Sequence, residues 1–303
     1  SEKALIVVSE GLQYHEKSEG LLLLKTKVLD ELRRYKDANS TLSLLLKVNP
    51  NHSEARALSG KIGDFSFKNK IGLSYDYVYF DKQFDDPWHL ISIDYGRQMG
   101  LGSVNARINF ANRFATRGTQ FELDIYPRIS KVLYAYMSAG YSKSSIFPEF
   151  RTGFSLYANL PSAFEIEAGF RMLKFNEPTW IYTASVGKYF KNYWFNLKTF
   201  LTPFNNSVSQ SLSLSSRYYF GASDDYLSLT LGTGLSPDNQ RNNILYNSTS
   251  SYKLKSNNVS LGFHKSIKTS NVIFLNGSLE NQEYLQDTRG NQYVISAGYM
   301  KRF

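Results

Sequence analysis

The sequence of 303 residues contains no cysteine. This absence excludes a disulfide-stabilised fold, catalysis by a thiol, a thiolate metal site and lipidation at an N-terminal cysteine. Long hydrophobic runs are missing too: the longest early ones, 4–8 and 21–24, fall far short of the roughly 18 residues of a membrane-spanning helix. The sequence therefore argues against a helical membrane protein. It shows no signal peptide and begins at Ser1, so we expect a processed or trimmed chain.

Aromatic side chains are few at the start of the chain, and 43 of the 46 lie beyond residue 65. The charge is divided in the same way, because residues 1–65 carry +1 of the net charge of +9. These differences predict two unlike regions, a helical segment at 1–64 and a β-domain at 66–303.

The first region has the pattern of amphipathic helices. Leucine and valine recur at intervals of three and four residues in 21–32 and again in 42–46, and Pro50 then ends the pattern. A shift of 34 residues superposes Leu12 on Leu46, and 34 residues is the period of tetratricopeptide repeats. The stretch LLLKVNPNHSEARAL also resembles a junction between two such repeats. An unrelated helical hairpin is the alternative.

We expect only about three helices here, too few to bury all their apolar faces. The surplus face would meet the turns of the β-domain, further repeats or, as we prefer, another protein. The candidate partner-binding residues are Leu21, Leu22, Leu23 and Leu24.

Beyond Gly63, apolar and polar residues alternate up to the C-terminus. Each alternating segment is about ten residues long, which suits a tilted strand crossing a bilayer, and short turns alternate with longer loops. A soluble sandwich also alternates, but its strands are usually only about five to six residues long. The pattern favours a mainly β fold: a transmembrane, antiparallel, up-and-down β-barrel after the helical segment.

Fourteen segments carry the strand pattern, with a long extracellular excursion at 236–256. The strand number must be even if both barrel ends lie on the side of the helices, so twelve and sixteen strands are the alternatives. The last strand alternates outward residues up to the final phenylalanine, which resembles the signal read by the barrel-assembly machinery. The predicted assembly signal is Tyr293, Ile295, Tyr299 and Phe303.

The strand phase opposite to the apolar residues should face the lumen. It carries seven acids and five bases, so we expect the charges to pair and the lumen to be narrow or plugged. A selective path for anions would show one dominant sign. The predicted lumen-facing charges are Asp76, Asp94, Arg107, Glu122, Asp124, Arg151, Glu165, Glu167, Arg171, Lys198, Arg217 and Glu280.

Three stretches carry a family resemblance: Gly153–Phe175, Thr183–Pro203 and Ser216–Asp238. They resemble the YaiO-type outer-membrane β-barrel family, which often places tetratricopeptide helices before the barrel. The most telling residues are Leu160-Pro161, Gly187-Lys188-Tyr189, Tyr193-Trp194, Tyr219-Phe220-Gly221 and Ser236-Pro237-Asp238. The family's biochemical role is poorly defined, so the resemblance implies an architecture more than a function.

Catalytic residues are hard to find in this sequence. His264 and Ser266 share a strand face, which resembles the pair of a lipid A deacylase, but the alternation points them inward at the end away from outer-leaflet lipid. Four histidines without cysteine give no plausible metal cluster. We therefore expect no enzyme, no catalytic residues, no metal and no cofactor.

The positive charge belongs to the barrel and is expected at its loops and rims, where it would meet outer-membrane lipids and lipopolysaccharide rather than nucleic acid. The rim residues expected to carry it are Lys82, Arg97, Arg113, Arg117, Lys143, Lys174, Lys255 and Arg289.

These patterns place the protein in the outer membrane of a Gram-negative bacterium, with its helices in the periplasm, where we expect them to bind another envelope protein. The function we expect is envelope export of the exopolysaccharide type, through or beside the barrel, by analogy of fold with known exporters. A non-transporting scaffold subunit of an outer-membrane complex is the alternative, and a barrel-embedded lipid hydrolase is a lesser one.

Overall fold

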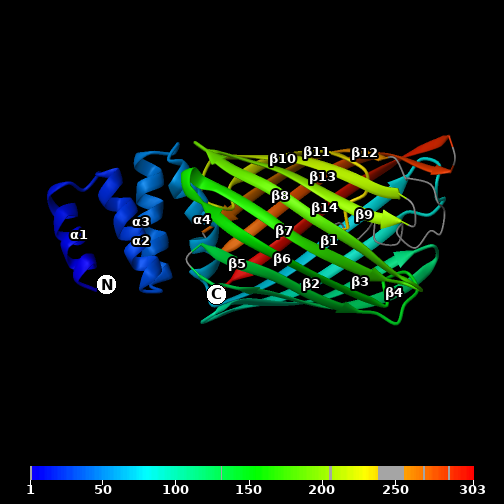
Figure 1. The fold of residues 1–303 in the computed structure, drawn as a ribbon, viewed down its shortest axis with the longest axis horizontal. Helices are drawn as coiled ribbons and strands as arrows, with labels where there is room; N and C mark the ends of the chain where they lie inside the picture. The colour runs from blue at the N-terminus through cyan, green and yellow to red at the C-terminus, as the bar shows by residue number, and fades with distance from the viewer. Residues whose placement is uncertain (1, 131, 205–206, 238–255, 269, 286) are drawn as a thin grey trace.

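The computed structural model contains a small helical stack followed by a closed β-barrel (Figure 1). It describes residues 2–130, 132–204, 207–237, 256–268, 270–285 and 287–303. Most of the excursion expected at 236–256 lies outside these ranges. None of the helices in the described ranges is long and apolar enough to cross a membrane.

Four helices occupy the described part of the N-terminal segment: α1 (Glu2–Tyr14), α2 (Glu19–Glu31), α3 (Tyr35–Val48) and α4 (Ser53–Phe65). The starts of α2 and α4 are 34 residues apart, as the repeat period predicts. About three helices were expected, and the described residues contain four. The first helix, α1, buries Val8 and packs Leu5 and Leu12 on the other helices, while Ile6 and Val7 are 58% and 68% exposed.

Capping and packing define the helical stack. The Ser18 hydroxyl accepts a hydrogen bond from the backbone N–H of Leu21 (3.4 Å), and Nδ1 of His52 accepts one from that of Ala55 (3.3 Å). Both satisfy N–H groups that have no partner within the first helical turn. Between the helices lies a small apolar core, formed by Leu22, Leu29, Ala38, Leu42, Leu45, Ala55 and Ile62.

Fourteen antiparallel strands form the barrel in the described ranges, each paired with its neighbours in sequence, and β1 pairs with β14 to close it. This confirms the predicted fold class and strand number. The strands are β1 (Asn69–Phe80), β2 (Trp88–Met99), β3 (Gly102–Arg113), β4 (Thr116–Pro127), β5 (Leu133–Tyr141), β6 (Phe150–Leu160), β7 (Phe164–Lys174), β8 (Pro178–Phe190), β9 (Tyr193–Phe204), β10 (Ser207–Tyr219), β11 (Tyr226–Thr233), β12 (Ser256–Ile267), β13 (Asn271–Leu285) and β14 (Thr288–Arg302).

The two faces of the barrel wall differ as the alternation predicts. Apolar side chains cover the outer face, where Leu261 and Ile295 are 63% and 61% exposed. In lipid such exposure is favourable, and every strand is paired on both sides, so backbone groups need no water. The opposite phase carries the polar side chains into the lumen.

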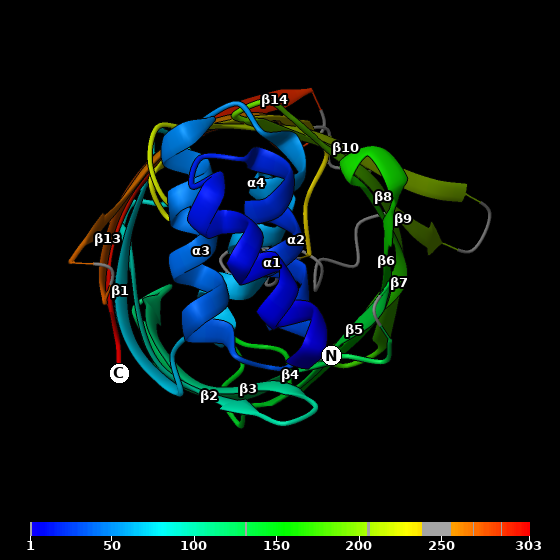
Figure 2. The ribbon, with the colours of Figure 1, turned by 90° about the vertical axis from the view of Figure 1, so that its left-hand side faces the viewer.

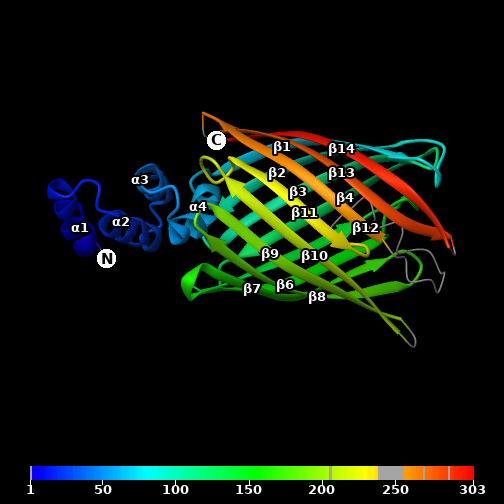
Figure 3. The same ribbon diagram turned by 90° about the horizontal axis from the view of Figure 1, so that it is seen from above.

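The helices lie across one mouth of the barrel, called here the helical end (Figure 2). Seen from the side, α4 is nearest to the barrel and α1 is farthest from it (Figure 3). The opposite mouth, where the longer loops lie, is called the loop end.

The C-terminus closes the barrel at the helical end. Asn69 and Phe303 exchange two backbone hydrogen bonds of 2.9 Å, and the Phe303 side chain is 56% exposed on the outer face. Tyr293, Ile295 and Tyr299 share that face. The structure thus puts the proposed assembly signal on the lipid-facing side of the closing strand.

Replacing Phe303 with aspartate is expected to reduce barrel insertion strongly, because it places a charge in the signal that the assembly machinery would read. Heat-modifiable gel migration of outer-membrane fractions measures the inserted form. The matched control is Phe190→Asp, at the helical-end terminus of β8, where the ring is 53% exposed. Equal losses in both variants would show that the C-terminal position has no special role.

Candidate functional site in the barrel lumen

Charged side chains line the lumen along one part of the wall. All twelve predicted lumen-facing charges lie on the strand phase opposite to the exposed apolar residues. Most of them belong to β3–β10, while Asp76, Asp94 and Glu280 lie on β1, β2 and β13. The polar lumen is thus strongly charged on one side.

Glu122 of β4 is the centre of the first charged cluster. Its carboxylate pairs with Arg151 on β6 (2.6 Å) and with Arg107 on β3 (3.2 Å). Arg107 also approaches Asp124 (3.6 Å), which accepts a hydrogen bond from the Tyr136 hydroxyl (3.2 Å). Two acids and two bases therefore neutralise one another inside the wall.

Glu167 of β7 is the centre of the second cluster. Its carboxylate lies 3.3 Å from the Lys198 ammonium and 3.7 Å from the Arg171 guanidinium. The Ser155 and Ser185 hydroxyls donate to it at 2.7 and 3.0 Å. Through these contacts the Glu167 carboxylate links β6, β7, β8 and β9.

A third group forms a stack of planar side chains near the helical end. The guanidinium of Arg217 lies 4.7 Å from the ring centroids of both Trp194 and Tyr226. The His264 ring then follows Tyr226 at 4.3 Å and Phe274 follows His264 at 5.4 Å, with both pairs nearly parallel. These groups from β9 to β13 form a continuous layer on the inner wall.

This layer bears on the hydrolase alternative. His264 is held between two aromatic rings, while the Ser266 hydroxyl donates to Asp225 at 2.7 Å. The Ser266 hydroxyl thus hydrogen-bonds to Asp225 rather than to His264. The geometry therefore does not support a nucleophile–base pair.

Neutral polar side chains dominate the other part of the inner wall. On β10–β14 the inward phase is rich in hydroxyl, amide and glycine residues, and Ser215 and Thr230 hydrogen-bond to each other at 3.0 Å. This neutral wall includes Ser211, Ser213, Ser215, Ser228, Thr230, Asn258, Ser260, Asn276, Ser278 and Ser296. Such a surface offers donors and acceptors without a dominant charge.

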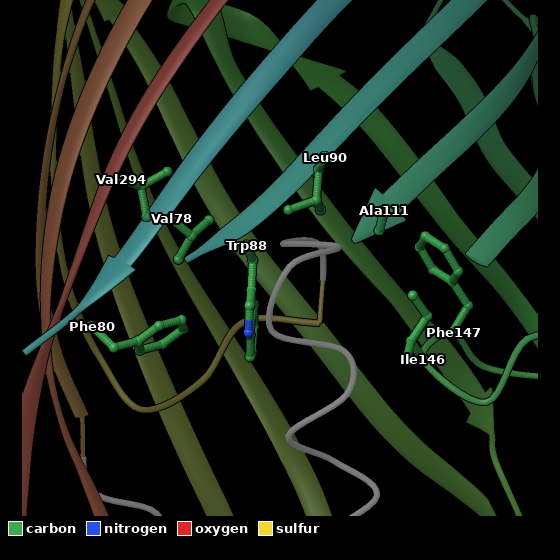
Figure 4. Packing of buried hydrophobic residues seen from close by; sticks show 8 residues of the cluster. All are labelled: Val78, Phe80, Trp88, Leu90, Ala111, Ile146, Phe147 and Val294. Carbon is green, nitrogen blue, oxygen red and sulfur yellow. The ribbon is translucent and has the colours of Figure 1, made fainter. Parts of the chain in front are cut away.

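An apolar cluster occupies the inner face near the loop end (Figure 4). It joins inward residues of β1–β3 and β14 to two residues of the loop after β5: Val78, Phe80, Trp88, Leu90, Ala111, Ile146, Phe147 and Val294. The loop is tied to β4, because the Ser142 hydroxyl donates to the carbonyl of Thr119 (2.6 Å). Sequence reasoning missed this cluster because a loop that folds inward has no periodic pattern.

Arg113 corrects one expectation. It was expected on a solvated rim, but only 1% of it is exposed, and its guanidinium lies over the rings of Trp88 (5.4 Å) and Phe147 (5.2 Å). The delocalised guanidinium stacks well on aromatic faces, which explains its place within an apolar cluster. Lys255, another expected rim residue, lies outside the described residues.

Polar contacts attach the helical stack to the rim. The carboxylate of Asp30 pairs with the Arg128 guanidinium after β4 (3.4 Å), and Arg33 donates to the carbonyl of Gly100 between β2 and β3 (2.8 Å). Ser53 accepts from the backbone N–H of Lys191 between β8 and β9 (2.6 Å). The helices thus contact the rim on several sides of the mouth.

Arg56 of α4 makes the most buried of these contacts. Its guanidinium donates to the carbonyl of Gly221 (2.5 Å) in the turn between β10 and β11 and lies 5.6 Å from the Tyr219 ring. Burial lowers the pKa of the Arg56 guanidinium from its ordinary value, although nearby Tyr219 and Asp225 oppose this change. The arginine fastens α4 to this turn.

The same turn binds the end of the closing strand. Arg302 of β14 pairs with Asp224 through two contacts of 2.7 and 2.9 Å, and its guanidinium lies 5.8 Å from the ring of Phe67, in the link between α4 and β1. Burial raises the pKa of the Asp225 carboxyl, but hydrogen bonds from Ser266 and Ala222 outweigh burial and leave it below its ordinary value.

The predicted partner-binding leucines lie in different environments. Leu22 is 3% exposed and Leu23 also packs on the helical core, whereas Leu24 is 50% exposed. Leu21 lies against α1, near Gly11. Of the four, Leu24 has the side chain most available to a partner, because four consecutive residues of a helix point in different directions.

Removing the Glu167 carboxylate is expected to destabilise the barrel by about 3–5 kcal/mol, because buried bases then lose their partner. Glu149→Ala is the control, since its ion pair with Lys174 (3.3 Å) is exposed and is worth about 0–1 kcal/mol. The measurement is the temperature at which the folded band is lost on gels. Equal shifts for Glu167→Ala and Glu149→Ala would mean that the buried cluster adds no stability.

Comparisons with known proteins agree with this architecture. A search of curated proteins found no match to the sequence. Among solved structures, the CymD monoaromatic hydrocarbon channel superposes with a TM-score of 0.57 at 10% identity, covering 84% of this chain and 94% of that one. A bacterial polysaccharide outer membrane secretin superposes with a TM-score of 0.51 at 10% identity, covering 78% and 98%. Such low identities show a shared fold alone.

The family comparison is more specific. The model of the YaiO membrane beta barrel domain matches residues 68–239, which is more than half of the chain. This match confirms the resemblance found in the sequence and agrees with the outer-membrane barrel that the structure shows. The chain belongs to the YaiO outer-membrane β-barrel family.

Proposed function

We propose that the protein is a gated conduit for export across the outer membrane, with its helices in the periplasm acting as the gate. The observation that carries this proposal is the helical stack lying across the helical-end mouth and attached to rim turns by polar contacts (Figure 2). The contacts of Arg33 and Ser53 are exposed, and exposed polar contacts are individually weak, so release of the stack mainly requires breaking the buried contacts of Asp30 and Arg56.

The lumen suggests the class of cargo. Its acids and bases pair with one another in the clusters around Glu122 and Glu167, so the wall offers no field of a single sign to ions. The neutral wall of β10–β14 instead offers hydroxyls and amides. Donors and acceptors of this kind suit a polyhydroxylated cargo such as a polysaccharide chain.

A disulfide lock tests the gate. A Cβ atom built on Gly63 of α4 lies 3.9 Å from the Cβ of Ser223 on the rim, and bridged cysteines have a Cβ separation of about 3.5–4.5 Å. The chain has no other cysteine, so the pair Gly63→Cys and Ser223→Cys forms a single defined bridge. It would hold α4 against the rim.

We expect the oxidised double variant to block the flux of a neutral oligosaccharide from proteoliposomes, and dithiothreitol to restore the slow flux that brief openings of the unmodified protein allow. The two single-cysteine variants are the controls and should not respond to oxidation. Flux that is equal before and after reduction would contradict the gate, and no flux in any state would favour the scaffold function.

A second candidate function has its own observation. Ile6, Val7 and Tyr14 of α1 are 58%, 68% and 83% exposed at the part of the stack farthest from the barrel. An apolar face in that position suits a scaffold subunit that binds another envelope protein. Under this alternative, Val7→Glu should remove a co-purifying protein while leaving barrel insertion unchanged, and Lys3→Glu on the same helix is the control.

A further inference from the structure

The lipid-facing wall has a local depression between β9 and β13. Strand register aligns outward residues in rows across these strands. Three consecutive rows, taken from the loop end towards the helical end, define the depression, and the first consists of Leu197, Leu214, Leu231, Val259 and Leu279. The next row is Phe195, Ser216, Leu229, Leu261 and Gly277, and the third is Tyr193, Tyr218, Leu227, Phe263 and Leu275. Ser216 and Gly277 are therefore small residues set among large ones.

A groove of about 510 Å³ follows from this arrangement. The second and third rows line it, together with Arg217, Ser228 and Gly262 of the inward phase. A Cβ atom at Gly277 would meet nothing within 4 Å, so the groove is open at that residue. Its apolar walls face the membrane, and its volume is within the range of about 300–1,000 Å³ typical of ligand sites.

Positive charge lies at the helical end of the groove. Lys265, two residues beyond Phe263 on the same outer face, is 42% exposed, and its ammonium lies 3.3 Å from Asp225 and 5.2 Å from the Phe220 ring. An ammonium has three donors, and Asp225 already accepts hydrogen bonds from the Ser266 backbone (2.7 Å) and hydroxyl (2.7 Å) and from Ala222 (3.1 Å). Lys265 can therefore also bind an anionic group.

Two further lysines lie in the turns beside the groove. Lys191 precedes β9 and Lys268 follows β12, and both are exposed at the helical end. Asp224, the other acid of this rim segment, is engaged by Arg302. The charge at this end of the groove is therefore positive, which suits a phosphate group at the membrane surface.

We propose that this groove binds an anionic phospholipid, with one acyl chain in the groove and its phosphate at Lys265, on the side where Lys191 adds positive charge. A flexible acyl chain can follow a groove, whereas the convex wall of a second barrel cannot fill it. Because lipid tails are as apolar as leucine, affinity depends on the fit of the chain and on the headgroup charge. The proposal does not depend on the gate function, although Lys191 lies in a rim turn that also contacts Ser53 of α4.

Native mass spectrometry of the full chain, from micelles with equal phosphatidylglycerol and phosphatidylcholine, tests the site. We expect preferential retention of phosphatidylglycerol. Lys265→Gln should weaken it about fivefold, the effect of one lysine near an anionic surface. Gly277→Leu and Ser216→Leu should each abolish retention by filling the groove.

The controls place the same changes elsewhere on the outer face. Ala168→Leu alters an exposed small residue on β7, and Arg97→Gln removes an exposed charge near the helical end of β2; neither should change retention. Heat-modifiable migration verifies that each variant is folded. Equal retention of both lipids, unchanged retention in folded Gly277→Leu, equal loss in the controls, or a dimer in place of lipid adducts would each overturn the proposal.

Discussion

The pairing of β1 with β14 is the constraint on which the rest of the structure depends. Backbone N–H and C=O groups cannot remain unpaired in lipid, so the sheet must close on itself. The register of this pair sets Ile71 opposite Lys301 and Lys70 opposite Arg302. It thereby puts Phe303 on the membrane side and Arg302 on the lumen side. Arg302 then reaches Asp224 and lies near Phe67, so closure of the barrel also fixes the base of the helical stack.

Closure of the barrel also explains why the charged residues of the lumen lie in clusters on one part of its wall. Charges that are turned inward need partners, since an unpaired buried charge is costly. The clusters around Glu122 and Glu167 provide them on one part of the wall, where they also join neighbouring strands. Apart from Arg217, Glu280 and Arg302, the inward phase of the strands from β10 to β14 carries mainly small neutral residues instead. One side of the lumen thus supports the wall, and the other offers a neutral polar surface.

Much of this architecture could be predicted from the sequence because the side-chain period of a strand is fixed. The alternation gives the fourteen strands and the inward phase of all twelve charges, from Asp76 to Glu280. It does not give the ion pairs: the approach of Arg107 and Arg151 to Glu122 depends on register, which turn geometry decides. Nor does it give the inward loop of Ile146 and Phe147 or the burial of Arg113, because neither follows a period.

The most direct measurement of the gate is the planar-bilayer conductance of the full chain with two rim contacts removed, Asp30→Ala and Arg56→Ala. The unmodified protein should be closed for most of the recording, because its helices lie across the mouth. The double variant should open for much longer, while its barrel still migrates as a folded band. If both proteins gave the same conductance, the helices would not be a gate, and the barrel would be a scaffold rather than a conduit.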